Sequence, residues 1–147
     1  MYNEMANQIS STVEILKALG HPVRLRLAAM MRGGELCVCQ MTAVLGLAAS
    51  TVSAHLSDLK RARLVEDRKD GRWVLHRLSQ HPSAAAHLEP VWKSVGGDPQ
   101  IEEDAKILRE LRRVPVEELC RVDLDLKRLG IRRPRRDGVR SGAAWRS

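Results

Sequence analysis

Aromatic side chains are scarce in this chain of 147 residues, which has no phenylalanine, three tryptophans and one tyrosine. The hydrophobic core must therefore come from Leu, Val, Ile, Met and Ala, a composition that favours helix-on-helix packing over a β-sandwich. No stretch approaches the roughly 18 apolar residues that a membrane span needs. The first residues also lack the charged-then-apolar order of a signal peptide. We therefore expect a cytoplasmic protein with no membrane partner.

Cysteine is rare as well, since the chain has three, at Cys37, Cys39 and Cys120. An odd number without secretory features argues against a disulfide framework and leaves metal binding, redox sensing or plain burial as their uses. The sequence also lacks a recognisable nucleophile–base pair, a Gly-rich phosphate loop and a pair of catalytic carboxylates. We therefore expect a protein that is not an enzyme and that uses no organic cofactor.

The positive charge is unevenly distributed. The net charge is +7, and residues 127–147 hold eight of the 25 Lys and Arg residues with a single acid, Asp137, whereas residues 1–126 are balanced. Because this end is rich in Arg, Pro and Gly, residues 130–147 are expected to form a basic, disordered tail. Two roles stay open for the tail: a solvated segment, or a source of non-specific phosphate contacts.

Apolar residues at helical spacing predict a series of short helices. The first is expected over residues 10–19, which leaves residues 1–9 as an N-terminal tail, and Pro22 opens the second, over residues 23–31. The remaining helices are expected over residues 35–45, 49–62, 84–95, 101–114 and 116–129. The predicted domain covers residues 10–114, and residues 115–129 add a C-terminal helix that carries Cys120.

The middle of the chain has the pattern of a winged helix-turn-helix. Gly46 separates two short helices, and the second has small and polar outer residues, as in a helix-turn-helix. Residues 64–68 and 73–78 then favour strands, and Asp70-Gly71 between them is a strong hairpin signal. The predicted fold class is mainly α with a small β-hairpin wing, a winged helix-turn-helix.

Candidate DNA contacts lie on the second of these helices and on the wing. Hydroxyl and imidazole groups can bond to phosphates or base edges, and Lys and Arg can neutralise phosphates. The candidate residues are Ser50, Thr51, Ser53, His55, Lys60, Arg61, Lys69 and Arg72. An ordinary surface role is the alternative for each cation, and packing is the alternative for His55.

Cys37 and Cys39 form a C-x-C pair, and thiolates select soft ions. On a regular α-helix, residues i and i+2 point about 200° apart. Both sulfurs can therefore hold one ion only if the start of this helix is unwound or lies outside the helix. We hypothesise that ion binding distorts the first helix of the helix-turn-helix and thereby moves the second.

The chain resembles the ArsR/SmtB family of metalloregulatory repressors. The matching stretches are LKALGHPVRLRLAAM at 16–30, ELCVCQM at 35–41 and STVSAHLSDLKRARLVEDRKDGRWVLHRLS at 50–79, and the ELCVC element is most similar to the arsenic-responsive branch. The resemblance implies a homodimer formed by the first helix and the helices after the wing. It also implies a recognition helix at about 49–62 in the major groove of a palindromic, double-stranded operator, which is released when a ligand binds.

The same resemblance implies As(III) or Sb(III) as the inducer. These ions commonly take three sulfurs, and Cys120 is the only cysteine besides the C-x-C pair. The predicted ligands are therefore Cys37, Cys39 and Cys120, the last in cis or in trans. A repressor that responds to Cd(II), Pb(II) or Zn(II), and a thiol-redox-sensing repressor with the same C-x-C pair, remain alternatives.

Three positions depart from the family pattern. Thr42 stands where arsenic-responsive relatives often have a third cysteine, three residues after the C-x-C pair. Ala54 stands where family members usually have Arg before the His of S-x-H-L, and Ala48 where a Ser often caps the recognition helix.

Overall fold

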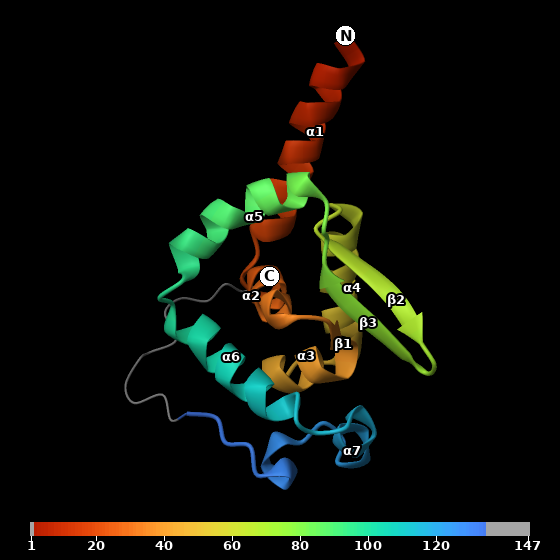
Figure 1. The fold of residues 1–147 in the computed structure, drawn as a ribbon, viewed down its shortest axis with the longest axis vertical. Coiled ribbons are helices and arrows are strands. Elements are labelled where there is room, and N and C mark those ends of the chain that lie inside the picture. Colours follow the sequence, from red (N-terminus) through yellow and green to blue (C-terminus); the bar gives the residue numbers. More distant parts are fainter. Residues whose placement is uncertain (1, 135–147) are drawn as a thin grey trace.

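The computed structural model describes residues 2–134 and has a helical body with a small three-stranded sheet at its side (Figure 1). This arrangement confirms the predicted mainly α winged helix-turn-helix fold. The elements are, in chain order, α1 (Tyr2–Leu19), α2 (Pro22–Met30), η1 (Met31–Gly33), β1 (Leu36–Cys37), α3 (Val38–Leu45), α4 (Ala49–Arg61), β2 (Val65–Asp70), β3 (Trp73–Leu78), α5 (Pro82–Val95), α6 (Pro99–Leu111), α7 (Val116–Arg121) and η2 (Leu126–Leu129).

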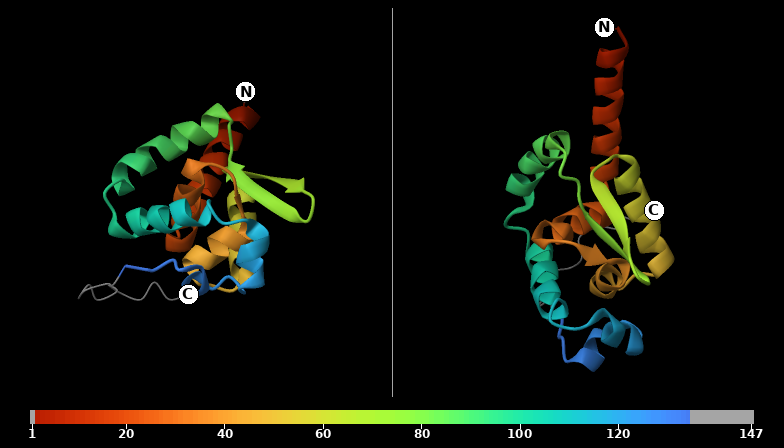
Figure 2. Two further views of the ribbon diagram at one scale, coloured as in Figure 1. Left: turned by 60° about the horizontal axis from the view of Figure 1, so that its bottom comes forward. Right: turned by 45° about the vertical axis from the view of Figure 1, so that its right-hand side comes forward.

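Helix α1 begins at Tyr2, so the prediction that residues 1–9 form a tail is wrong for the described residues 2–9. No Gly or Pro interrupts that stretch, and Ser10 and Ser11 lie inside the helix instead of capping it. The helix projects beyond the rest of the body (Figure 2). Its side chains Ile9, Val13 and Leu16 remain exposed although they are large and apolar.

The expected helix over residues 35–45 is shorter in the structure, because its first residues form a strand. Leu36 pairs with His76, and Cys37 pairs with Leu75, so β1 adds a third strand to the expected hairpin in the order β1-β3-β2. Helix α3 begins only at Val38. Two residues cannot show a strand period in the sequence, and the strand forms because β3 offers an unpaired edge.

The wing is the β2–β3 hairpin, which extends away from the helices (Figure 2). Asp70 pairs with Trp73, so the two loop residues are Gly71 and Arg72, one position later than the expected Asp70-Gly71 turn. Gly71 has a φ of +58°, which an L side chain rarely adopts, and this requirement explains a glycine there.

Helices α3 and α4 form the helix-turn-helix, with a bend of 114° between them. Gly46 ends α3 in a left-handed conformation, and Ala48 occupies the N-cap of α4 without a side-chain cap. No single helix within residues 2–134 is long and apolar enough to cross a membrane, and only this bent pair meets the requirements of length and composition.

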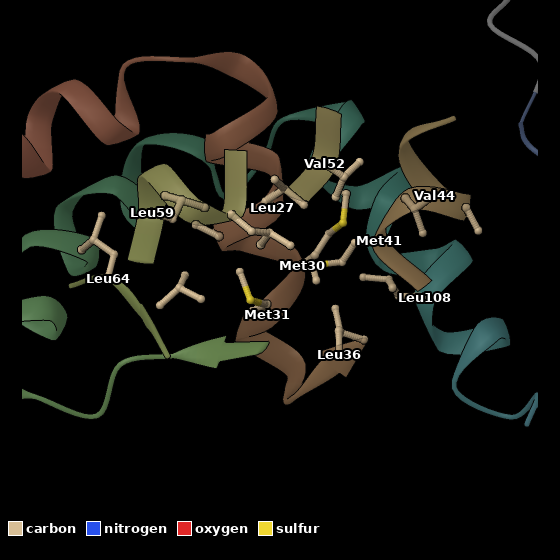
Figure 3. Close-up of a cluster of buried hydrophobic side chains, with 14 of the residues drawn as sticks. Leu27, Met30, Met31, Leu36, Met41, Val44, Val52, Leu59, Leu64 and Leu108 are labelled. Atoms are coloured by element: carbon tan, nitrogen blue, oxygen red, sulfur yellow. The ribbon is translucent and has the colours of Figure 1, made fainter. Parts of the chain in front are cut away.

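The core is aliphatic, as the composition predicts, and lies between α2, α3, α4 and α6 (Figure 3). Helix α4 contributes the apolar residues of its inward face, and β1 contributes Leu36. The largest fully buried side chains are Leu27, Leu36, Met41, Leu56, Leu59, Leu64, Ile107, Leu111, Leu119, Val44, Val52 and Val65. The branched and sulfur-containing side chains fill the space that aromatic rings occupy in many cores.

The segment after α6 folds back onto α3 instead of forming the expected single helix over residues 116–129. Helix α7 ends at Arg121 because Asp123 and Leu124 adopt positive φ angles of 53° and 60°. The expected disordered tail also begins too early at residue 130. Ile131 is buried, and Arg133 Nη2 donates to the carbonyl oxygen of Ala43 at 2.9 Å. Residues 135–147 of that expected tail lie outside the described part of the chain.

A buried ion pair joins α2 to α6. Asp104 is 2% exposed, and its two oxygens accept from Arg26 Nε at 2.8 Å and Arg26 Nη2 at 2.9 Å. A bidentate pair of this kind fixes the relative orientation of the two helices. Removing one partner leaves a charge without compensation in a water-poor environment.

We expect Asp104→Ala to lower the free energy of unfolding by about 3 kcal/mol, because it strands the partly buried Arg26. Urea unfolding followed by circular dichroism measures this change. Glu66→Gln is the matched control, since it removes the exposed pair with Arg77 at 3.1 Å and should cost less than about 1 kcal/mol. Equal losses in the two variants would contradict a structural role for the buried pair.

Candidate functional site

Cys37 lies at the junction of strand β1 and helix α3, outside the helical turn. Its φ of −86° and ψ of 159° are extended, and it occupies the N-cap of α3. Its backbone N–H donates to Gln40 Oε1 at 2.9 Å, and its sulfur accepts from the Gln40 backbone N–H. A thiol here replaces the Ser or Thr of an ordinary capping box.

The extended backbone at Cys37 lets the two sulfurs of the C-x-C pair meet. The Cys39 thiol, in the first turn of α3, forms a hydrogen bond with the Cys37 sulfur. The sequence left two ways for the sulfurs to converge: an unwound helix start, or a position outside the helix. The structure has the second arrangement, because Cys37 precedes the helix. Helix α3 is regular from Val38 onward, so sulfur convergence does not require it to unwind.

The two thiols differ in acidity. The hydrogen bond from Cys39 lowers the pKa of Cys37 to about 6, together with the backbone N–H groups of Gln40 and Cys39, against an opposing effect of burial. The pKa of Cys39 is raised because its thiol donates to Cys37, because it is buried and because a neighbouring thiolate repels a second one. Cys37 is therefore the more acidic thiol of the pair, and the thiolate is the form that binds soft ions.

Cys120 lies beside the C-x-C pair in the same chain. Its sulfur is 3.7 Å from the sulfur of Cys39, although 81 positions separate the two residues. Helix α7 packs against α3, with Leu119 buried between them. The structure thus brings all three predicted ligands together, with Cys39 in the middle.

The three thiols form a row and not a closed cage. Within the described part of the chain, no group of three or more His, Cys, Asp or Glu side chains is arranged to hold a metal ion. Thr42, where relatives often have a cysteine, is buried on α3, and its hydroxyl has no hydrogen-bond partner among the described residues. The three sulfur atoms are donors that suit a soft ion. Their side chains must rotate before all three sulfurs can contact the same ion.

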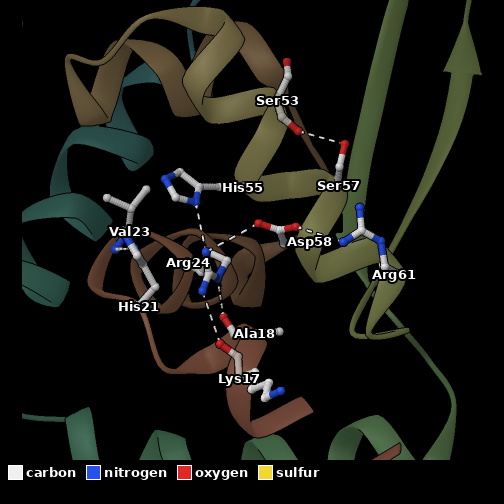
Figure 4. Close-up of polar contacts among 10 residues, drawn as sticks. All are labelled: Lys17, Ala18, His21, Val23, Arg24, Ser53, His55, Ser57, Asp58 and Arg61. Atoms are coloured by element: carbon white, nitrogen blue, oxygen red, sulfur yellow. Dashed lines mark hydrogen bonds and ion pairs between the residues drawn. The ribbon is translucent and has the colours of Figure 1, made fainter. Parts of the chain in front are cut away.

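Helix α4 presents the small polar residues that the sequence singles out. Val52, Leu56 and Leu59 are buried against the body, whereas Ser50, Thr51 and Ser53 are exposed at its N-terminal end. The Ser57 hydroxyl donates to the Ser53 carbonyl oxygen at 3.0 Å (Figure 4). An exposed helix of small polar residues, packed on a second helix through its opposite face, can approach a groove or a phosphate backbone closely.

His55 does not share this exposed surface. Its ring lies 4.5 Å from that of His21, and its Nδ1 is 3.3 Å from Arg24 Nη1 (Figure 4). Arg24 also donates to the carbonyl oxygens of Ala18 and Lys17, at 2.6 and 3.2 Å. His55 therefore belongs to the contact between α4, α2 and the end of α1, which favours the packing interpretation.

The predicted cations fall into two groups. Lys60 Nζ pairs with Asp67 at 2.8 Å, and Arg61 pairs with Asp58 at 3.3 Å, so both are held by carboxylates of this chain. Lys69 and Arg72 lie at the exposed end of the wing, and the Arg72 guanidinium is 5.6 Å from the centre of the Trp73 ring. The wing tip is thus the stronger cationic candidate.

Two arginines outside the set of candidate DNA contacts organise the site through partners that the sequence did not indicate. Arg24 joins α1, α2 and α4, and Arg68 on β2 forms two 2.7 Å hydrogen bonds with Glu35, directly before β1. Neither shows a periodic signal, because each acts through a partner more than 30 positions away. Only the pairing of β1 with the wing could have indicated the Glu35–Arg68 contact.

Comparison with known proteins agrees with this geometry. The profile of "Bacterial regulatory protein, arsR family" matches residues 21–67, which span the C-x-C pair and the helix-turn-helix. The chain is 36% identical to the arsenical resistance operon repressor of Escherichia coli, over 55% of this chain and 72% of that protein. The chain therefore belongs to the arsR family of bacterial regulatory proteins, a family of transcriptional regulators and not of enzymes.

Two further relatives have different names, and only the first name mentions arsenic. The chain is 37% identical to the arsenic resistance transcriptional regulator ArsR1 of Pseudomonas putida, over 55% of this chain and 62% of that protein. It is also 37% identical to the HTH-type transcriptional repressor SmtB of Mycobacterium tuberculosis, over 53% of this chain and 58% of that protein. This chain thus spans about three fifths of the length of each relative. Sequence identity alone does not show which of the two it resembles more.

Solved structures are similar as well. HlyU from Vibrio cholerae has a TM-score of 0.54 and 31% identity, over 58% of this chain and 92% of that chain. The homodimeric winged helix-turn-helix DNA-binding domain of a possible ArsR-family regulator from Mycobacterium bovis has a TM-score of 0.55 and 27% identity, over 63% and 86%. These similarities cover the winged helix-turn-helix fold.

The histidines predict how stability depends on pH. Burial lowers the pKa of His55 below its ordinary value of 6.5, and Arg24 adds to this, against Asp58. Burial, His55 and Arg24 lower the pKa of His21, again against Asp58. Between the lowered pKa values and 6.5 the unfolded chain binds more protons, so the free energy of unfolding should fall as pH falls through this window.

We expect His55→Gln to show a smaller loss of unfolding free energy between pH 7.5 and 5.5 than the native chain, because one titrating group is gone. Urea denaturation at the two pH values measures it. His87→Gln is the control, because that ring is exposed on α5. The same pH dependence in His55→Gln and the native chain would exclude the α2–α4 contact as its source.

Proposed function

We propose that this chain is a homodimeric DNA-binding transcriptional repressor that leaves its operator when As(III) or Sb(III) binds the thiols of Cys37, Cys39 and Cys120. The observation that supports this most directly is the contact of the Cys120 sulfur with that of Cys39, 3.7 Å away, beside the C-x-C pair. We place this activity in the cytoplasm, where thiols stay reduced and available to ions.

In this proposal α4 is the recognition helix in the major groove. The exposed hydroxyls of Ser50, Thr51 and Ser53 contact phosphates and base edges, and Lys69 and Arg72 carry the wing onto the backbone. Lys60 and Arg61 have a secondary role, because each must leave a carboxylate before it meets a phosphate. We assign His55 to positioning α4 on α2.

The proposed dimer uses α1. Ile9 and Leu16 are 67% and 61% exposed, and Val13 on the same helix is 41% exposed. Large apolar residues exposed together mark an association surface. The Mycobacterium bovis domain with the same fold is homodimeric by its title, and a two-fold dimer reads a palindromic operator with two equivalent recognition helices.

The donor set favours As(III) or Sb(III) over Zn(II). Structural zinc takes four nitrogen, sulfur or oxygen ligands in a tetrahedron. Cys37, Cys39 and Cys120 offer three sulfurs, which is one ligand fewer than that tetrahedron needs. A trivalent arsenic or antimony ion with three sulfurs is complete without a fourth protein ligand. The relatives named ArsR1 and SmtB are equally similar to this chain in sequence. The choice between these ions therefore depends on the number of donor atoms.

The 3.7 Å contact also supports a second candidate, a thiol-redox repressor. Cys39 and Cys120 would form a disulfide when an oxidant such as hydrogen peroxide accepts two electrons and their two protons and is reduced to water. A sulfur–sulfur bond of about 2.05 Å requires the side chains to approach further. Responses to peroxide and to arsenite separate the two candidates.

We expect saturating arsenite to weaken binding to an operator duplex selected from a random DNA pool by about 10–100-fold. Fluorescence anisotropy measures the affinity, and thiolate absorption near the ultraviolet edge measures arsenite binding. Cys37→Ser and Cys39→Ser should abolish release, because each removes a sulfur of the C-x-C pair. Cys120→Ser should weaken arsenite binding.

The control for these cysteine variants is Thr42→Ser, a buried change on α3 next to the thiols that removes no sulfur. A Cys120→Ser variant with native arsenite affinity would exclude the three-sulfur site and favour a two-sulfur one. Release by Zn(II) or peroxide but not by arsenite would replace the proposed inducer.

The wing contributes to DNA affinity through charge alone in this proposal. Combined Lys69→Gln and Arg72→Gln should therefore reduce the slope of log K against log salt by about 2, since each phosphate contact contributes about 0.9. Lys93→Gln is the control, because Lys93 is exposed on α5, which belongs neither to the helix-turn-helix nor to the wing. An unchanged slope in the wing variant would show that the wing tip does not touch DNA.

A further inference from the structure

Strand β1 belongs to two parts of the molecule at once. Its residue Cys37 carries a candidate ligand sulfur and caps α3, while its backbone pairs with Leu75 on β3. Leu75 in turn pairs with Arg68 on β2. Cys37, Leu75 and Arg68 therefore lie in one row across the sheet, and the wing continues directly from the thiol site.

The ion pair of Glu35 and Arg68, which we call the fork, spans the same row of the sheet. Glu35 precedes β1 and accepts from Arg68 Nε and Nη2, both at 2.7 Å. Because the strand order is β1-β3-β2, this side-chain pair passes over the central strand and ties one edge of the sheet to the other. Two parallel charge-assisted bonds fix orientation as well as distance.

The opposite side of the same connection is held to the helical body. Arg112, directly after α6, donates to the carbonyl oxygens of Gly34 at 3.4 Å and Glu35 at 3.3 Å. A side chain at Gly33 would approach Arg112 to 3.3 Å, so the turn and the guanidinium are closely packed. Arg112 anchors the residues before β1 to the end of α6. We therefore expect a displacement of Cys37 to be directed toward the wing.

We propose that Glu35 and Arg68 are positioning residues that transmit ligand binding at Cys37 to the wing. This inference rests on the proposed function and names the route of its regulation. When the Cys37 sulfur turns toward an ion shared with Cys39 and Cys120, its backbone carries Leu75 with it, and the fork carries Arg68. Lys69 and Arg72 follow Arg68 in the chain, so the wing tip changes its position relative to the recognition helix.

This route differs from a distortion of α3. Since Cys37 is already outside the helix, sulfur rotation can leave α3 regular while it pulls on the sheet. A route through α3 and α4 would not depend on Glu35. A route through the wing depends on the fork, and loss of the fork should uncouple the two sites without removing either.

The experiment compares Glu35→Gln and Arg68→Met with the native full-length chain. For each, the coupling ratio is the operator dissociation constant with saturating arsenite divided by that without it. We expect either variant to lower this ratio two- to fivefold, because a single solvent-accessible ion pair contributes only modestly. Arsenite affinity without DNA, read from thiolate absorption, should change less than twofold.

Matched variants separate coupling from damage to the fold. Combined Glu35→Arg and Arg68→Glu restores the fork in reverse and should recover the coupling ratio. Glu66→Gln removes another pair within the wing, that with Arg77, without touching β1, and should keep the native ratio. The double variant Glu35→Gln, Arg68→Met should lose no more than either single change.

Hydrogen exchange gives a readout that needs no DNA. In the native chain arsenite should alter exchange in β3 and also in β2, whereas in Glu35→Gln the change in β2 should be reduced. Native coupling and native β2 response in Glu35→Gln would overturn the wing route and leave the proposed function intact. A native chain that does not bind arsenite would overturn both.

Discussion

The extended backbone at Cys37 is the constraint on which the candidate site depends. A helical conformation there would point its sulfur away from that of Cys39, because a separation of two residues spans more than half a helical turn. With an extended conformation, the same residue joins the sheet, caps α3 and presents its sulfur to its neighbour. Pairing with β3 maintains this conformation, so the wing supports the thiol site before any ligand arrives.

The segment after α6 completes the site from a distant part of the sequence. Leu119 and Ile131 are buried, and Arg133 binds the carbonyl oxygen of Ala43 on α3. These contacts lie on both sides of the turn that ends α7, so the position of Cys120 is set by apolar packing at two points. A third sulfur thus comes from an added helix, while Thr42 occupies the α3 position where relatives often have one.

Much of the fold could be predicted from the sequence because its signals are local. Helical spacing, Pro22 and the Asp70-Gly71 region indicated the helices and the hairpin. Most of the predicted helix and strand ends differ from the observed ones by only a few residues. Strand β1 could not be predicted, since two residues carry no period and the strand exists only through its partner. The extension of α1 to Tyr2 was missed because polar residues there give no amphipathic pattern.

The candidate site divides in the same way. The three cysteines were evident from residue type and from resemblance to a known family, and their proximity followed only from packing of α7. The inward position of His55 could not be inferred, because Arg24 and His21 reach it from another helix. The pairing of Glu35 with Arg68 could not be inferred either, since a long-range ion pair leaves no characteristic spacing in a single sequence.

The distance between Cys39 and Cys120 along the chain has a consequence for biosynthesis. The helix-turn-helix and the wing are complete by residue 78, while the third sulfur emerges from the ribosome some 40 residues later. During translation, about two to eight seconds separate these events at 5–20 residues per second. A nascent chain therefore presents its two paired thiols before the third exists, and the proposed three-sulfur site can form only after Cys120 has emerged.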